Sequence, residues 1–274
     1  MRVSFIHAGD PTWASYRYRA LAPARWLGAS MNDWSADVVV LAKPLPHEVV
    51  CATHFQRNGG RVIVDICDDH FDRLEYQKAA AIAELVTCPT AAMAQIIWYR
   101  TGQGAMVIPE AYEFEHSAPH CTGTRLLWFG HGSNYESLAR VLPWLQGYPL
   151  EIVSNHPQAT TPWSVNAVRQ ALTRADIVLL PATAPGKSPN RAVEAIRSGC
   201  LVIAEPHRSL IDIPGVWIGP RLEQGIEWAQ RCPGRAIDLI ADGQAYVAKY
   251  FAPACVAQSW REAIALVATQ AVAS

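Results

Sequence analysis

The sequence has no long hydrophobic run, no closely paired cysteines and no excess of charge of either sign. No apolar stretch approaches the ~20 residues that a membrane-spanning helix needs, although half of the 274 residues are hydrophobic. The formal net charge is -1, so bulk electrostatics favour neither nucleic acid nor an anionic membrane surface as a partner. We therefore expect no nucleic-acid partner and at most a peripheral association with membranes.

The seven cysteines are scattered, odd in number and include no C-x-x-C motif. Cys67, Cys88 and Cys200 lie in or beside apolar, strand-like runs, which favours reduced core residues over a disulfide framework. No signal peptide is expected, because Met1 leads directly into a strand-like segment. These features predict a cytoplasmic protein.

Two series of strand-like runs alternate with helical patterns. The first series extends from Arg2 to Ile108 and the second begins at Arg125, with the polar stretch Glu110–Gly123 as a linker between them. This alternation predicts an α/β protein with two parallel, Rossmann-like sheets covered by helices and facing each other across a cleft. We place the domains at residues 1–115 and 122–274, and packing of the last helices back on the first domain is an option.

The most informative stretch is 175–206, ADIVLLPATAPGKSPNRAVEAIRSGCLVIAEP. It predicts a buried strand, a proline-rich loop, a helix that Ser188 caps, and a second buried strand. Open α/β sheets bind ligands where a helix begins at a strand's carboxyl end, because its free N–H groups and dipole favour an anion. Lys187 adds a positive charge there and Glu194 lies one turn into the helix. A phosphate near Lys187 and sugar hydroxyls near Glu194 suit this pattern, although any βαβ unit has such a turn.

Several other polar residues have both a functional and a structural interpretation. The acidic patch with Asp68, Asp69 and His70 follows a strand and could supply a general base, or it could be a helix cap with solvated charges. Arg17 and Arg19 could bind an anionic acceptor or donor phosphates, or form structural salt bridges. Asp10 could contact a sugar hydroxyl or cap the next helix. A further group, His116, His120 and Cys121, has the spacing of a weak metal-site candidate in a polar linker.

These motifs resemble those of the GT-B glycosyltransferases, in particular the retaining, family-4-like group. The most specific match is A-D-I-V-L-L-P followed by K-S-P-N-R-A-V-E-A-I-R-S-G-C-L-V-I-A. Supporting matches are W-F-G-H-G-S-N at the start of the second domain and S-Y-R-Y-R-A-L-A-P-A near the start of the first. Two features depart from the family pattern. Gly186 stands where many relatives have the first of two glutamates, and the usual basic pair is replaced at best by His131 and Arg140.

The resemblance implies roles for individual residues of this sequence. Glu194 is expected to hydrogen-bond the ribose, while Lys187, Ser188 and Asn190 approach the diphosphate and the sugar. The glycine-bearing loop with Gly130, His131 and Gly132 is expected below the donor phosphates. Gly9, Asp10 and Arg17 belong to the first-domain loop on the acceptor side. By resemblance no metal and no cofactor is needed, because the helix N-terminus and basic side chains neutralise the leaving diphosphate.

The sequence therefore predicts a hexosyltransferase-like enzyme that moves a sugar from a nucleotide-sugar donor to an acceptor hydroxyl. The acceptor is a glycan, a lipid-linked molecule or a small molecule. Lys187 would stabilise the leaving group, and Asp69 or His70 would act as base if the donor phosphate does not take the proton. Two alternatives remain open. One is a catalytically degenerate subunit that binds a sugar nucleotide or a protein partner, and the other is a nucleotide-sugar epimerase on the same fold.

Overall fold

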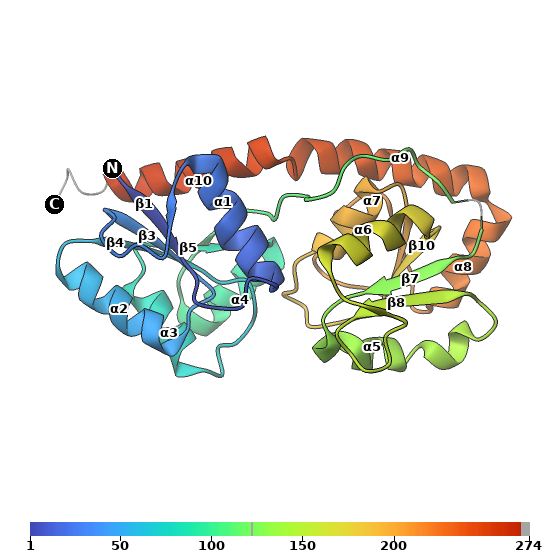
Figure 1. The fold of residues 1–274 in the computed structure, drawn as a ribbon, viewed down its shortest axis with the longest axis horizontal. Helices are drawn as coiled ribbons and strands as arrows, with labels where there is room; N and C mark the ends of the chain where they lie inside the picture. The colour runs from blue at the N-terminus through green and yellow to red at the C-terminus, as the bar shows by residue number, and fades with distance from the viewer. Residues whose placement is uncertain (122, 270–274) are drawn as a thin grey trace. The chain divides into compact units, whose positions relative to one another are not determined.

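The computed structural model describes residues 1–121 and 123–269, which divide into two compact units (Figure 1). The first unit contains Met1–Ala111, the short segment Gly186–Ser188 and the chain from Ala252 onward, and the second contains Tyr112–Pro185 and Pro189–Phe251. Thr122 and the end of the predicted last helix, residues 270–273, lie outside the described residues. The domain boundaries predicted at residues 115 and 122 stay predictions.

The first unit is built on a six-stranded parallel sheet in the order β2-β1-β3-β4-β5-β6. Its strands are β1 (Val3–Ile6), β2 (Ser30–Met31), β3 (Val38–Ala42), β4 (Arg61–Asp65), β5 (Leu85–Cys88) and β6 (Ala105–Val107). Its helices are η1 (Tyr16–Leu21), α1 (Ala22–Leu27), α2 (Pro46–Arg57), α3 (Leu74–Ile82), α4 (Ala91–Thr101) and α10 (Pro253–Thr269).

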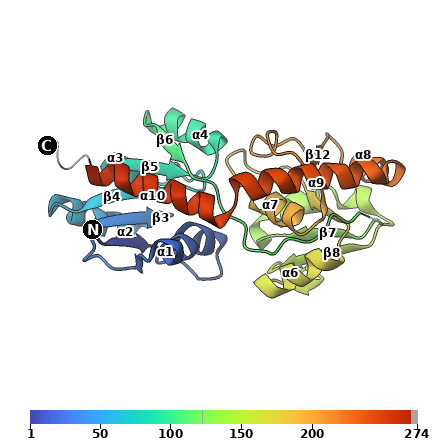
Figure 2. The same cartoon turned by 90° about the horizontal axis from the view of Figure 1, so that it is seen from above.

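Helices cover both faces of this sheet because its central strands are apolar on both sides. On one face, α1 and α10 enclose a core that includes Phe5, Val40 and Trp260. On the other face, α2, α3 and α4 pack on Val39 and Val64. Figure 1 shows α1 and α10 above the sheet and α2 and α3 below it, and in Figure 2 α10 crosses over the strands. Burial on both faces explains why the strands are continuous hydrophobic runs.

The second unit repeats the architecture with the strand order β12-β11-β10-β7-β8-β9. Its strands are β7 (Leu126–Phe129), β8 (Leu150–Ser154), β9 (Thr161–Pro162), β10 (Ile177–Leu180), β11 (Leu201–Ala204) and β12 (Val216–Ile218). Its helices are η2 (Gly132–Asn134), α5 (Tyr135–Ala139), η3 (Leu142–Leu145), α6 (Val165–Arg174), α7 (Asn190–Arg197), α8 (Leu222–Arg231) and α9 (Pro233–Tyr250). The strand order reverses between β7 and β10, which is the switch point where such sheets bind ligands.

The predicted alternation of strands and helices in two parallel sheets is confirmed. The sequence pattern of Ser15–Leu27 predicts a helix, and the segment is helical throughout, with the six-residue π-helical stretch η1 leading into α1. Two local predictions are wrong. The sequence pattern after Asn134 predicts one helix that reaches Gln146, but the segment is broken into short pieces. Ser188 does not cap α7, because that helix starts at Asn190 and the Ser188 hydroxyl instead donates to Glu110. Among the described residues, no helix is both long and apolar enough to cross a membrane.

A buried ion pair holds the first unit together at the end of its central strands. The Arg19 guanidinium, on η1, donates to both carboxylate oxygens of Asp65 at 2.9 and 2.5 Å, and both side chains are fully buried. Arg19 also donates to the Ile108 carbonyl at 2.5 Å, and the Thr87 hydroxyl donates to Asp65 at 2.7 Å. The guanidinium lies 5.3 Å from the centre of the Trp260 ring. One cation therefore connects η1, β4, the end of β6 and α10.

Removing Arg19 should be strongly destabilising, because Asp65 would keep a buried charge without a partner. Arg19→Met is expected to lower the free energy of unfolding by about 3–5 kcal/mol, and Arg19→Met combined with Asp65→Leu should recover part of that loss. Urea unfolding followed by circular dichroism measures both. Arg25→Ala, on the exposed side of α1, is the control and should stay within about 0.5 kcal/mol. An Arg19→Met protein with wild-type stability would contradict this account of the pair.

Candidate functional site

At the switch point of the second unit, the chain after β10 leads into the start of α7. No side chain caps this helix, and the N–H groups of a first helical turn have no acceptor within the helix. The first-turn N–H groups and the helix dipole therefore favour an anionic ligand at this end. Asn190 is the first residue of this helix, and its predicted approach to a donor stays a prediction.

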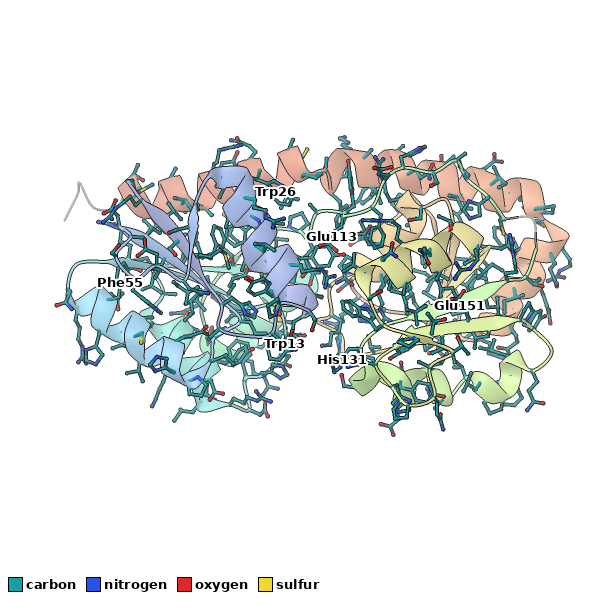
Figure 3. The ribbon with its side chains drawn as sticks, in the orientation of Figure 1. Trp13, Trp26, Phe55, Glu113, His131 and Glu151 are labelled. Atoms are coloured by element: carbon teal, nitrogen blue, oxygen red, sulfur yellow. The ribbon has the colours of Figure 1, made fainter. Side chains whose placement is uncertain are left out.

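The glycine-bearing loop after β7 uses most of its backbone amides internally. Gly130 N–H donates to Val153 O at 3.1 Å, and Gly132 N–H donates to the side-chain oxygen of Asn155 at 2.6 Å. His131 accepts the Ser133 N–H at 3.2 Å and so caps η2. Figure 3 shows His131 at the end of the unit toward which the arrows of β7 and β8 point, and Glu151 away from it. The loop is at the predicted place, but its role as a cradle of free amides stays a prediction.

Arg191, the second residue of α7, extends to the end of β7. Its Nη1 donates to the Phe129 carbonyl at 3.2 Å, and the guanidinium lies 5.9 Å from the centre of the Trp128 ring. A Cβ atom at Gly130 would lie 3.3 Å from the same Nη1. Burial lowers the pKa of Arg191 to about 10. The glycine therefore leaves room for a partly buried cation at the switch point.

Glu194 is 2% exposed and is bonded to the backbone of its own unit. Its two carboxylate oxygens accept the N–H groups of Glu113 and Phe114 at 2.6 and 3.1 Å. These bonds hold the segment that leads into the second unit against α7, and they supply a structural reason for a glutamate at this position. The predicted hydrogen bond from Glu194 to a ribose stays a prediction.

Arg140, which the sequence suggested in place of the basic pair of the family pattern, forms an ion pair with Glu205. Its guanidinium forms a two-pronged contact with the Glu205 carboxylate, whose second oxygen also accepts the Ala182 N–H at 2.7 Å. Burial acts to raise the pKa of Glu205, but hydrogen bonds from Arg140 and Ala182 outweigh it and lower the pKa. The pair fastens the loop after β10 to the end of β11, so the charge of Arg140 is balanced within the protein.

In the first unit, three charged side chains meet beyond the carboxyl end of the sheet. Asp68 accepts from Lys187 at 2.6 Å and from Lys43 at 3.2 Å. Burial acts to raise the pKa of Asp68, but the charges of Lys187 and Lys43 outweigh it and hold the pKa at about 2. A carboxylate with so low a pKa is a poor general base. Asp68 instead orients Lys187, the predicted leaving-group residue, and the trio keeps one net positive charge.

Asp69 and His70, the two predicted base candidates, have different surroundings. The Asp69 carboxylate lies 3.8 Å from the Arg100 guanidinium and is about one-third exposed, which fits a solvated ion pair. Burial is the main cause that lowers the pKa of His70, whose ring packs edge-on against Tyr76. The imidazole is therefore neutral near pH 7 and keeps the capacity to accept a proton. Both roles stay predictions.

The predicted first-domain loop is shaped by His7, at the end of β1. The ring of His7 is 1% exposed, accepts the Gly9 N–H at 2.9 Å and lies 3.3 Å from the Ser15 hydroxyl. Gly9 is required sterically, since a Cβ atom there would come within 2.7 Å of the rings of His7 and Trp13. Figure 3 shows Trp13 at the same end of the unit. Burial, assisted by the charge of Lys43, lowers the pKa of His7 to about 4.

The remaining predicted residues of this loop make local contacts. Asp10 accepts both the N–H and the hydroxyl of Thr12 at 2.7 Å, which lowers its pKa, and these bonds lie in the turn before the helix and do not cap it. Arg17 donates to the Thr12 carbonyl at 2.9 Å and lies 5.3 Å from the centre of the Tyr18 ring. These contacts order the loop that follows β1. Whether Asp10 and Arg17 also contact a substrate stays a prediction.

The metal alternative in the linker does not assemble. His116 bonds to Gln244 at 3.1 Å, His120 bonds to the Ala175 carbonyl at 2.9 Å, and Cys121 is a buried thiol whose pKa is raised to about 11 by burial. Within residues 1–121 and 123–269, no group of three or more histidine, cysteine or acidic side chains is gathered so that it could hold a metal ion.

Sequence reasoning missed four side chains near the two candidate regions: His7, Lys43, Glu110 and Arg191. His7 and Lys43 stand directly after β1 and β3, and Glu110 lies three residues after the end of β6, so an inspection of every strand end would have found them. Lys43 also has a left-handed backbone with φ of 61°, which is uncommon outside glycine. Glu110 is buried, which raises its pKa, and accepts the Ser188 hydroxyl at 2.6 Å. Arg191 carries no such sequence signal, since it occupies an ordinary helical position.

Comparison with known proteins gives a likeness of fold at low sequence identity. No protein-family model and no curated protein matches the chain. Among solved structures, Anabaena HepE in complex with UDP-glucose superposes with a TM-score of 0.73 at 11% identity, covering 97% of this chain and 99% of HepE. An alpha-glucosyltransferase solved with UDP-glucose and DNA containing an abasic site gives 0.60 at 10% identity, with 98% and 99% covered. A UDP-N-acetylglucosamine 2-epimerase gives 0.53 at 10% identity, with 93% of each chain covered.

At these identities the comparisons show the fold alone. The chain has the two Rossmann-like α/β units of the GT-B fold, as the sequence predicts, and the match extends over both units. Glycosyltransferases and an epimerase both have this fold, so the likeness does not decide between their reactions.

The burial of neutral His7 should make stability depend on pH. The pKa of about 4 in the folded protein lies below the ordinary 6.5, so the stabilisation is present above pH 6.5 and is lost as the pH falls toward 4. His7→Gln should therefore lose about 2 kcal/mol less than the wild type between pH 7.5 and pH 5 in urea unfolding. His54→Gln, an exposed position on α2, should follow the wild-type profile. An unchanged pH profile in His7→Gln would show that the pKa of His7 is the same in the folded and the unfolded protein, which would contradict this account.

Proposed function

We propose that the protein transfers a sugar from a nucleoside-diphosphate sugar to an acceptor hydroxyl. The observation that carries the proposal is the uncapped start of α7 at the switch point of the second unit. The proposal is also supported by the likeness of fold to HepE, which was solved with UDP-glucose, and this likeness extends over 97% of this chain. A helix N-terminus at this place in the sheet suits a diphosphate group.

The proposed reaction retains the configuration at the anomeric carbon and uses neither a metal ion nor a cofactor. The bond between the anomeric carbon and the phosphate oxygen breaks, the diphosphate leaves with the electron pair, and the acceptor oxygen bonds to the same carbon. The acceptor proton goes to the departing phosphate. Retention is supported by the sequence resemblance to retaining enzymes and by the fold likeness to an alpha-glucosyltransferase solved with UDP-glucose.

The residues divide between the two units in this proposal. The second unit binds the donor through the start of α7, the Gly130 loop and the predicted ribose contact of Glu194. Lys187 stabilises charge on the leaving diphosphate, and Asp68 holds its ammonium group in place. The first unit provides the acceptor side, with Trp13 and neutral His70 near its carboxyl edge. The donated sugar is a hexose, and the acceptor is a glycan, a lipid-linked molecule or a small molecule in the cytoplasm.

Donor binding and turnover test this proposal together. A thermal-shift screen against UDP, GDP, ADP, CMP and dTDP should find stabilisation by one nucleoside diphosphate, unchanged by EDTA. The matching nucleotide sugar should then release that nucleoside diphosphate when acceptors are added. Release of nucleoside diphosphate with formation of a new glycoside supports transfer, whereas interconversion of the intact nucleotide sugar would identify an epimerase. Binding without either reaction would identify a degenerate binding subunit.

Lys187 should matter more for turnover than for donor affinity. Lys187→Ala is expected to lower kcat by about 100-fold while the Kd for the donor changes by less than threefold, because leaving-group charge develops only in the transition state. Lys78→Ala, an exposed lysine on α3, should leave both constants unchanged. Equal kcat values for Lys187→Ala and the wild type would remove Lys187 from the chemistry.

A further inference from the structure

In the second unit, the guanidinium of Arg191 stands out because it is partly buried at the switch point and no carboxylate of the described residues lies beside it. Arg140 pairs with Glu205, Arg125 with Asp176 and Arg174 with Glu151. Among the described residues, Arg191 has no ion pair, and its guanidinium donates one hydrogen bond, to the Phe129 carbonyl. A guanidinium has five N–H donors, so most of its donor capacity is unused.

The surroundings of Arg191 offer no carboxylate to compensate for its burial. Burial alone accounts for the lowering of its pKa, and its charge in turn contributes to the lowered pKa of His207 on the neighbouring loop. The guanidinium packs over Trp128, whose own Nε1–H also lacks an acceptor among the described residues. A partly buried cation without a counter-ion costs free energy, so such a group is expected where a ligand brings the opposite charge.

The location of the charge indicates what that ligand is. The guanidinium lies at the end of β7 beside Gly130, and its own backbone belongs to the uncapped first turn of α7. The site therefore presents two sets of donors from adjacent residues, namely backbone N–H groups and a planar fork of side-chain N–H groups. One phosphate of a diphosphate can bind the backbone N–H groups and the other the Arg191 guanidinium, whose planar arrangement of N–H groups matches phosphate oxygens.

We propose that Arg191 binds the diphosphate of the nucleotide-sugar donor and supplies the fixed positive charge of the donor site. This inference rests on the proposed function for the nature of the donor. Arg140 and His131, the substitutes suggested by the sequence, are engaged elsewhere: Arg140 with Glu205, and His131 with Ser133. Arg191 reaches the site from the helix instead of from the loop after β7. Gly130 has the complementary role, because its missing side chain leaves room for the guanidinium.

A structural alternative makes the opposite predictions for stability. If Arg191 serves only to fasten α7 to β7, its replacement should lower the melting temperature and leave anion binding intact. If it is held for a ligand, Arg191→Gln removes an uncompensated charge, so the melting temperature of the unliganded protein should stay the same or rise. The two readouts, stability without ligand and affinity for an anion, therefore separate the two roles.

The test measures binding of UDP and of inorganic pyrophosphate by calorimetry to the full chain. Arg191→Gln should weaken both ligands about 10- to 100-fold, and Arg191→Lys should recover part of the loss. The salt dependence of pyrophosphate binding should also become shallower in Arg191→Gln. Arg197→Gln is the matched control, because Arg197 lies at the other end of α7 over the Tyr112 ring. It should bind both anions like the wild type.

The outcomes distinguish this inference from the proposed function. Pyrophosphate binding that depends on Arg191, in a protein that turns over no nucleotide sugar, would support the site and overturn the transfer reaction. UDP binding that is equal in the wild type and Arg191→Gln would overturn the role of Arg191 and leave the transfer reaction standing. If the wild type binds neither UDP nor pyrophosphate, the inference is wrong.

Discussion

A parallel sheet brings the carboxyl ends of all its strands to one edge, and every charge placed at that edge needs a partner or a ligand. In the first unit this requirement is met within the protein. Arg19 is neutralised by Asp65 in the core, and farther out Asp68 stands between Lys43 and Lys187. The ion pair in the core fixes the position of η1 relative to β4. It thereby also fixes one end of the predicted acceptor-side loop, which directly precedes η1.

In the second unit, one charge near the carboxyl edge of the sheet lacks a partner of opposite charge among the described residues. Arg140 is paired with Glu205, whereas Arg191 has no carboxylate partner within the part of the chain that the structure describes. The two units thus use one architecture with different electrostatics, since the first holds Lys43 and Lys187 beside a carboxylate and the second holds Arg191 at the switch point without one in its described part.

The sequence was sufficient for the fold because buried parallel strands are continuous apolar runs, such as Val38–Ala42 and Ile177–Leu180. The residue pattern also predicted the helix start that follows β10, which is where we place the candidate site. The sequence was not sufficient to predict which groups a given side chain bonds to in the folded protein. Glu194 could be expected to reach a ligand, but its bonds to the Glu113 and Phe114 N–H groups depend on where the linker passes. Arg191 is likewise informative only because its tertiary surroundings contain no carboxylate.

The last helix has a consequence for how the protein is made. One face of the first sheet, with Phe5 and Val40, is covered in part by Trp260 and its neighbours on α10. These residues leave the ribosome after the entire second unit. Domains usually fold as they emerge from the ribosome, N-terminal first. Here part of one apolar face of the first sheet stays exposed until α10, which covers it, has been synthesised. A chain that ended shortly before α10 would therefore expose this hydrophobic surface, which quality-control proteases and holding chaperones recognise.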